Sequence, residues 1–415
     1  MYKINIFYFL FFILWIVSIF LYNLNLVNNL HSFNNILLVL STMAYLIFFY
    51  KPQINISISL IIIIFIFLKI SILIFSLIDY DIFYHYLYTG DAYNYHFPSI
   101  EKLDFSNWLG YIFEYKMYAV ETGKLTHLLY AIPYNLFNPF FELFSNDKIY
   151  NLHIISYIVN IFLLSFTSWY MYIKLKRIIE TKYASYAVML FLFSPFIFAW
   201  SNYLMKETLY VCLIIISTIA ILEKKYFILF AVALFFLVDR MYMLYLFGLI
   251  FLLSNKINRF YMSMFIFLIV VTIYNIFPIQ IYIDQLIYIM EYGDNNATSG
   301  SSLLSEGYST NLLRVLFSPF FVSAFKEYYI YQNIFFREHL TVGILLTLFI
   351  FRILFNSKWN NFTYLIFLIL LFNLVLFPYS ARQKITVLIP ILSIVYPLYL
   401  YTRKYNLLLK TFWKI

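Results

Sequence analysis

An acid and a histidine five positions apart form the first group able to do proton-transfer chemistry. Asp91 and His96 lie in the stretch GDAYNYH, residues 90–96, between two long apolar segments. A carboxylate at this place could accept a proton from a hydroxyl group and make its oxygen a better nucleophile, which is the role of a general base. The alternative is structural: Asp91 caps the following helix and His96 forms a hydrogen bond at a membrane interface.

A lysine and an acid begin an apolar segment further along the chain. Lys206 and Glu207 follow the stretch from Ser194-Pro195 to Trp200-Ser201-Asn202, which is predicted to lead through a short outer turn from one helix to the next. An ammonium group at the start of a helix could bind a phosphate oxygen. The competing interpretation is a solvated turn between two helices.

Three arginines could bind phosphate more specifically, because a guanidinium group matches two phosphate oxygens at once. Arg240 follows Asp239 in the middle of a long apolar stretch, so the two form either part of a water-filled site or a self-neutralising pair. Arg314 lies five residues before Pro319, and Arg382 precedes the last apolar segment. Either of these two could instead be an interfacial anchor.

The segments that carry these residues are mostly apolar. Hydrophobic residues make up 64% of the 415 residues and the mean hydropathy is +0.84. Segments such as 54–78 and 149–173 are long enough to cross a hydrocarbon core of ~30 Å. The sequence therefore predicts an all-α, polytopic membrane protein with about twelve helices. The predicted segments are 5–24, 33–50, 54–78, 149–173, 183–201, 206–222, 226–238, 241–254, 260–281, 338–355, 360–378 and 385–401.

Charge sets the predicted orientation. The net charge is +9, and the basic residues gather in the loops on one side of the predicted helices, whereas the other side is acidic. A single span over 226–254 would move Lys256, Arg259 and the basic C-terminus to the outer side, against the positive-inside rule. A hairpin with Asp239 and Arg240 at its apex is therefore favoured. It leaves both termini in the cytoplasm and two large loops, 79–148 and 282–337, outside.

Other local features complete the expected architecture. We expect a single membrane domain over 1–415, because no polar stretch is long enough for a separate soluble domain. The piece 125–144 is semi-apolar and its prolines, Pro133 and Pro139, predict a broken helix in or near the outer interface. Lys69, inside the third segment, is expected to extend toward the membrane surface. Cys212 is the only cysteine, so no intrachain disulfide can form.

Several classes of protein lack support in the sequence. There is no phosphate-binding Gly-x-x-x-x-Gly-Lys loop, no dinucleotide-binding glycine pattern and no convincing set of metal ligands around His85 or His96. The basic residues follow the expected cytoplasmic loops, so no nucleic-acid partner is predicted.

The short motifs together resemble those of a known group. The stretch 90–96, the Ser201-x-x-x-x-Lys206-Glu207 turn after a segment with Pro195, the Arg240 hairpin and Arg314-x-x-x-x-Pro319 resemble bacterial polysaccharide membrane enzymes of the GT-C type. Within this group the chain most resembles O-antigen or oligosaccharide repeat-unit polymerases. The acidic motif follows the third apolar segment, whereas in GT-C mannosyltransferases it follows the first. This difference favours a polymerase.

The resemblance implies an enzyme of the bacterial inner membrane with its active site on the periplasmic face. Its substrates would be undecaprenyl-pyrophosphate-linked oligosaccharides, its surroundings the lipid bilayer, and a chain-length regulator protein a further partner. Neither a cofactor, a metal nor a nucleotide sugar is required. The implied roles are Asp91 as general base with His96 as its partner, Arg240 and Arg314 as pyrophosphate ligands, Lys206 as a supporting cation, Glu207 as its orienting group and Arg382 as a further substrate-binding candidate.

Three alternatives stay open. A GT-C glycosyltransferase that uses an undecaprenyl-phosphate sugar, or a ligase that joins polysaccharide to a lipid, would use the same outer face. A flippase for lipid-linked oligosaccharides would instead place charged residues through the depth of the membrane. Because the polar groups are predicted to gather outside, the flippase is less favoured.

Overall fold

The computed structural model describes part of the chain. The described residues are 56–78, 97–101, 103, 107–108, 124–143, 145–194, 197–198, 201–202, 204, 206–239 and 381–404, with six helical positions between 10 and 21. All regular structure in these ranges is helical, and they contain no strand. The chain forms two compact units: Met1–Arg240 with Ile389–Leu407, and Met241–Leu388 with Leu408–Ile415. The first unit holds nearly all of the described residues.

Two described helices, α3 and α8, are long and apolar enough to cross a membrane. Helix α3 (Ile58–Ile78) has 21 residues and α8 (Lys148–Leu175) has 28. At ~1.5 Å per residue their lengths are ~32 Å and ~42 Å, against a hydrocarbon core of ~30 Å. Large apolar side chains are exposed along both helices at helical spacing, as expected for contact with lipid. They are Leu60, Ile63, Phe67, Ile70 and Ile74 on α3, and Ile158, Phe162, Phe166 and Trp169 on α8.

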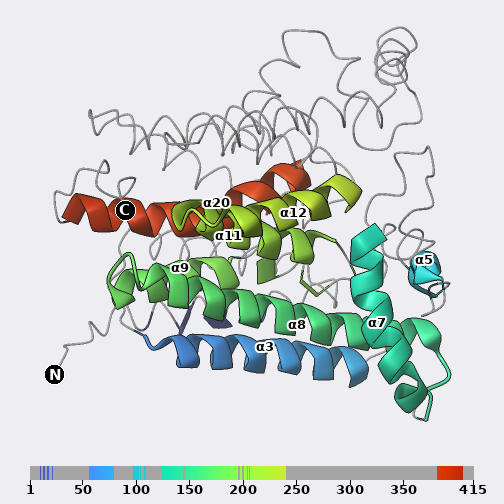
Figure 1. Ribbon diagram of the computed structural model, residues 1–415. Coiled ribbons are helices and arrows are strands. Elements are labelled where there is room, and N and C mark those ends of the chain that lie inside the picture. Colours follow the sequence, from blue (N-terminus) through green and yellow to red (C-terminus); the bar gives the residue numbers. More distant parts are fainter. Residues whose placement is uncertain are drawn as a thin grey trace, which may run out of the picture. The chain divides into compact units, whose positions relative to one another are not determined.

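Helix α8 is the centre of the first unit. Helices α3, α7 (Lys124–Phe141), α9 (Thr181–Leu192) and α11 (Glu207–Leu222) all pack against it (Figure 1). The start of α8 is fixed by Asp147, whose carboxylate accepts hydrogen bonds from the backbone N–H groups of Ile149 and Tyr150. Such a cap satisfies donors that have no partner inside the helix. The buried residues of α8 include several small or amide side chains, which allow polar contacts with the neighbouring helices.

Helix α7 is continuous, so the prediction of a broken helix was wrong. It runs through both Pro133 and Pro139 for 18 residues. Each proline removes one backbone hydrogen bond and crowds the preceding turn. The loss is offset by packing, because Leu128, Ala131 and Tyr134 are buried in a hydrophobic cluster with residues of α8.

Helix α9 is shorter than predicted. The sequence predicted a span over 183–201, whereas α9 has 12 residues and ends at Leu192. Pro195 follows closely, and proline disfavours helical geometry in the residue before it. At ~18 Å, α9 cannot cross a hydrocarbon core of ~30 Å alone. Helix α11 begins at Glu207 and confirms the predicted segment 206–222 closely.

Two further helices complete the described part. Helix α12 (Tyr226–Asp239) packs on α11 and α7 and ends where the hairpin apex was predicted. Helix α20 (Ala381–Lys404) includes the predicted segment 385–401, and its Tyr401 ring meets that of Tyr183 in α9 at 5.6 Å between centroids. Five predicted segments lie outside the described residues: 33–50, 241–254, 260–281, 338–355 and 360–378. Of the predicted segment 5–24, only the six helical positions between 10 and 21 are described.

Candidate functional site

The structure describes three of the predicted site residues. Lys206 and Glu207 are described in full, and Arg382 is the second residue of α20. The remaining candidates lie outside the described residues: Asp91, His96, Arg240 and Arg314. For His96 and Arg240, the contacts of described residues close by in the chain, Phe97 and Phe236, are given below.

Lys206 and Glu207 are inside the protein. Lys206 has 9% of its surface exposed and Glu207 has 2%. The solvated-turn interpretation is therefore wrong. Two oppositely charged side chains are retained in the interior only where other polar groups compensate for lost hydration, so this place is a candidate for function.

The chain between α9 and α11, residues 193–206, forms a segment that we call the helix break. Its Phe193 and Ser194 are fully buried, and helical geometry returns at Ile197 and Phe198, where the Phe198 N–H donates to Ser194 O at 2.9 Å. Non-helical backbone at membrane depth is tolerated only where protein or a water-filled cavity surrounds it.

Lys69 of α3 binds the helix break. Its side chain is fully buried, and its Nζ donates hydrogen bonds to the backbone oxygen of Phe198 and to Oδ1 of Asn202. The ammonium also lies 4.5 Å from the centre of the Phe198 ring and 5.6 Å from that of Tyr157. The expectation that Lys69 extends to the membrane surface was therefore wrong. Aromatic rings and two acceptors inside the bundle replace its hydration.

A second set of contacts reaches the helix break from α8. Asn160 donates through Nδ2 to the backbone oxygen of Ser201 at 3.1 Å, and its Oδ1 accepts from the Tyr130 hydroxyl at 2.7 Å. Tyr157 donates through its hydroxyl to Lys69 O at 2.9 Å, which joins α8 to α3 at the same level. Two helices, α3 and α8, thus hold the helix break directly through polar side chains, and Tyr130 of α7 bonds to Asn160 behind it.

These contacts lie near the middle of the two long helices. At ~1.5 Å per residue, Lys69 is ~16 Å from the first residue of α3 and Asn160 is ~18 Å from that of α8. The sequence placed residues 198–202 at the outer end of a span. The structure instead places the described ones, Phe198, Ser201 and Asn202, against the centre of α3 and α8.

A hydrophobic cluster connects the helix break to the segment that follows His96. The cluster contains Ile100 just before the end of α5 (Phe97–Glu101), residues of α7 and α8, and Leu204 of the helix break. Phe97, the residue after His96, packs against it, and Leu204 lies two residues before Lys206. Phe97 and Leu204, which are neighbours in sequence of His96 and Lys206, therefore share one cluster.

The end of α12 reaches the same region. Phe236, four residues before Arg240, contacts Tyr210 in the first turn of α11, with 5.7 Å between ring centroids. The start of α11 carries Lys206 and Glu207, so the helix end that precedes Arg240 lies next to them. Residues that flank two predicted site residues, Leu204 before Lys206 and Phe236 before Arg240, thus lie near the beginning of α11.

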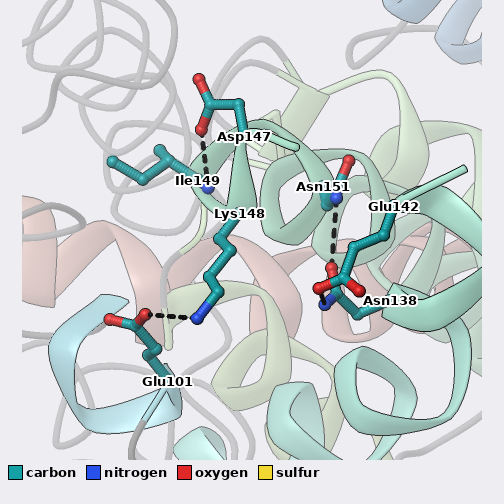
Figure 2. A network of polar contacts seen from close by, with 7 residues as sticks. All are labelled: Glu101, Asn138, Glu142, Asp147, Lys148, Ile149 and Asn151. Atoms are coloured by element: carbon teal, nitrogen blue, oxygen red, sulfur yellow. Dashed lines mark hydrogen bonds and ion pairs between the residues drawn. The ribbon is translucent and has the colours of Figure 1, made fainter. Parts of the chain in front are cut away.

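Polar contacts fix α5 against the start of α8 (Figure 2). Lys148 forms an ion pair with Glu101 at 3.3 Å, and Asn151 donates to Asn138 Oδ1 at 3.2 Å. Asn138 in turn donates to Glu142 at 2.6 Å. The Lys148 and Glu101 side chains are half-exposed, so this ion pair joins the end of α5 to the start of α8 but contributes little stability.

Sequence reasoning missed most of the polar groups around the helix break. Tyr130 and Asn160 were not singled out, Asn202 was named only as part of a turn, and Lys69 was given no role. A signal was present, since a lysine in the middle of an apolar segment is expensive unless it has partners inside the protein. The partners themselves could not be read from the sequence because they lie 30 to 133 positions apart.

No protein-family model matches the chain, and comparisons with curated proteins and with solved structures found no match. The chemistry of the site must therefore be argued from its residues. Among the described residues, no group of three His, Cys, Asp or Glu side chains is placed to hold a metal ion. The described polar groups around the helix break and the start of α11 are the amino groups of Lys69 and Lys206, the carboxyl group of Glu207, and the amide and hydroxyl groups of Asn160, Asn202 and Tyr130.

Proposed function

We propose that the protein is a membrane glycosyltransferase that polymerises undecaprenyl-pyrophosphate-linked oligosaccharide repeat units, that is, an O-antigen-type polymerase. One observation carries the proposal beyond the sequence motifs. Phe97, the residue after His96, packs against a cluster that contains Leu204, two residues before Lys206, and Phe236, four residues before Arg240, contacts Tyr210 in the first turn of α11. A base and two cations near one point are what this reaction needs.

The reaction makes few demands on a protein. The acceptor sugar hydroxyl attacks the anomeric carbon of the donor, the bond from that carbon to the pyrophosphate oxygen breaks, and the hydroxyl proton passes to a base. Pyrophosphate leaves without protonation if its charge is held, so the protein must supply cations, a base and correct positioning. Asp91 with His96 would be the base, and Arg240, Arg314 and Lys206 the cations.

The surroundings belong to the same proposal. The protein would lie in the bacterial inner membrane with both termini in the cytoplasm and the site open to the periplasm. The two long helices α3 and α8, with their exposed apolar side chains, support a bilayer environment. Arg382 would be a further substrate-binding residue and a chain-length regulator protein a further partner.

A second candidate, translocation of the lipid-linked oligosaccharide, has one observation in its favour. Polar groups were expected only outside the membrane, but Lys69 and Asn160 meet the helix break near the middle of the long helices. Discontinuous helices with polar contacts at mid-depth are typical of transporters.

Deletion of the gene tests the proposal. Surface polysaccharide is then separated by length. A polymerase mutant loses long chains and keeps a single capped repeat. Loss of all repeats supports translocation, and a repeat that lacks one sugar supports a GT-C transferase; either result contradicts the polymerase.

Purified protein separates the first two candidates directly. In detergent micelles there are no two sides to cross, so a polymerase still joins lipid-linked repeats into longer chains, whereas a translocator leaves them unchanged. Lys176→Met is the matched control, because Lys176 is exposed at the end of α8 away from the helix break. It should extend chains like the unmodified protein.

A further inference from the structure

Side chains of two other helices, α3 and α8, hold the helix break in place. Two of its backbone oxygens, those of Phe198 and Ser201, accept hydrogen bonds from Lys69 of α3 and Asn160 of α8. A backbone oxygen inside a bundle is costly when it lacks a partner. The path of the break therefore depends on these two donors.

Both described hydrogen bonds from the Lys69 Nζ go to residues of the helix break. Two acceptors, Phe198 O and Asn202 Oδ1, take hydrogen bonds from Nζ, and the Phe198 ring faces the same ammonium at 4.5 Å. No carboxylate is among the described partners of Lys69. A lysine placed inside the bundle, with its donors directed at one segment, fits a holding role better than a substrate-binding role.

We propose that Lys69 is a positioning residue: it fixes the geometry of the helix break and thereby the places of Lys206 and Glu207 at its end. Tyr157 contributes by donating to Lys69 O, which fixes α3 against α8 at the level of the lysine. The holding role concerns the chain itself and stands whatever reaction the site performs. Its effect on activity rests on the proposed polymerase function.

Cysteine labelling tests the holding role without any assay of activity. In a Cys212→Ala background, Ser194→Cys places a thiol at a fully buried position of the helix break. The Ser194 hydroxyl has no hydrogen-bond partner among the described residues, so the exchange removes no described bond. Ser168→Cys is the matched reporter, because Ser168 is equally buried, also without a described partner, and lies on α8 ~16 Å from Tyr157.

Both reporters are labelled with a maleimide in membranes, with and without Lys69→Met. Methionine fills a similar space but donates no hydrogen bond. We expect labelling of Ser194→Cys to become about ten-fold faster or more, since the segment opens locally, while labelling of Ser168→Cys stays slow. Unchanged labelling at Ser194→Cys overturns the proposal. So does equal acceleration at both positions, because the lysine would then stabilise the whole unit.

Two further variants keep the test informative if Lys69→Met fails to fold. Lys69→Arg keeps a donor for both acceptors and should restore most of the protection at Ser194→Cys. Asn202→Ala removes one acceptor and leaves Phe198 O, so its labelling should fall between the unmodified protein and Lys69→Met. If Lys69→Arg labels as fast as Lys69→Met, or Asn202→Ala as slowly as the unmodified protein, the hydrogen bonds are not what holds the break.

Activity is the second readout. In the micelle extension assay Lys69→Met should lower kcat about ten-fold with KM little changed, and Lys69→Arg should recover it, because a misplaced site loses transition-state contacts. A protected break with lost activity contradicts the positioning role. If Lys69→Met speeds labelling at Ser194→Cys but the protein without the Lys69 change extends no chains, the holding role stands and the polymerase function is contradicted.

Discussion

The Tyr130 hydroxyl donates to Asn160 Oδ1 over 2.7 Å and so links α7 to the centre of α8. Asn160 passes the contact on, because its amide nitrogen donates to Ser201 O in the helix break. One asparagine therefore joins three segments that are distant in sequence. Its side chain is fully buried, so each of these hydrogen bonds forms away from water.

Asn160→Ala should be strongly destabilising. It leaves the Tyr130 hydroxyl and Ser201 O without the asparagine, and we expect a loss of ~2–3 kcal/mol in the free energy of unfolding, against ~1 kcal/mol for Tyr130→Phe. Unfolding in detergent measures both. Ser217→Ala is the control, because the Ser217 hydroxyl donates to Leu213 O within its own helix and so joins no separate segments. Equal effects for Asn160→Ala and Tyr130→Phe would show that the bond to Ser201 O contributes nothing.

The cap of α8 gives a second prediction. Asp147 Oδ1 accepts from Ile149 N at 2.9 Å and from Tyr150 N at 3.2 Å. Asp147→Ala should cost ~1 kcal/mol in the free energy of unfolding, whereas Asp147→Ser keeps an acceptor and should stay close to the unmodified protein. Hydrogen exchange of the first turn of α8 is the sharper measurement. An alanine variant as protected as the serine variant argues against the cap.

Glu223 makes stability depend on pH. Burial favours the neutral carboxyl group, but hydrogen bonds from Lys174 and Lys225 outweigh it and hold the pKa of Glu223 below its ordinary value. A group whose pKa is lower in the folded state stabilises the fold above its unfolded pKa, and the contribution disappears as the pH falls through the folded value.

Glu223→Gln should therefore destabilise the protein by ~1 kcal/mol near pH 7 and have less effect as the solution becomes more acidic than about pH 4. Unfolding of both proteins in detergent across this range gives the measurement. The Lys174 Nζ and Glu223 Oε2 atoms are 3.0 Å apart and join the end of α8 to the end of α11. A difference in stability that stays constant with pH would mean that the charge of Glu223 is not involved.

Local signals predicted the helices well, and long-range contacts decided where prediction failed. The uniform apolar segments that became α3, α8 and α11 were found within a few residues, because length and composition are enough for such helices. The end of α9 and the continuity of α7 were missed. Helix α9 ends at Leu192, three residues before Pro195, whereas α7 continues through Pro133, although both prolines lack the backbone N–H group. The buried neighbours of Pro133, such as Ala131 and Tyr134, pack in a cluster with residues of α8, and one sequence does not reveal such packing.

The candidate site was predictable only in part. Lys206 and Glu207 were identified from their position at the start of an apolar segment, but as a surface turn rather than as buried groups. Lys69 and Asn160 are single polar residues in apolar segments. Their importance comes from the hydrogen bonds that both donate to the helix break. Such convergence requires the tertiary structure.

Lys206 should matter to activity more than to stability. With the proposed function, its ammonium contributes to holding the pyrophosphate, and a charge-assisted contact of this kind is worth about 10- to 100-fold in kcat/KM. Lys206→Met should show this loss in the micelle extension assay, and Lys206→Arg should recover part of it. If Lys206→Met extends chains as fast as the control Lys176→Met and the unmodified protein, Lys206 has no part in binding the pyrophosphate.

The contact between Tyr210 and Phe236 predicts that Arg240 lies close to Lys206. A three-residue turn joins α11 to α12, so the two helices run in opposite directions, and both residues lie about one turn beyond the contact, where packed helices are ~8–10 Å apart. In a Cys212→Ala background, Lys206→Cys with Arg240→Cys should be joined by a short bifunctional maleimide. Lys206→Cys with Phe227→Cys should not, because Phe227 is at the opposite end of α12. Tyr210→Cys with Phe236→Cys is the positive control: if it reacts and the pair at 206 and 240 does not, the cations are too far apart to share a pyrophosphate.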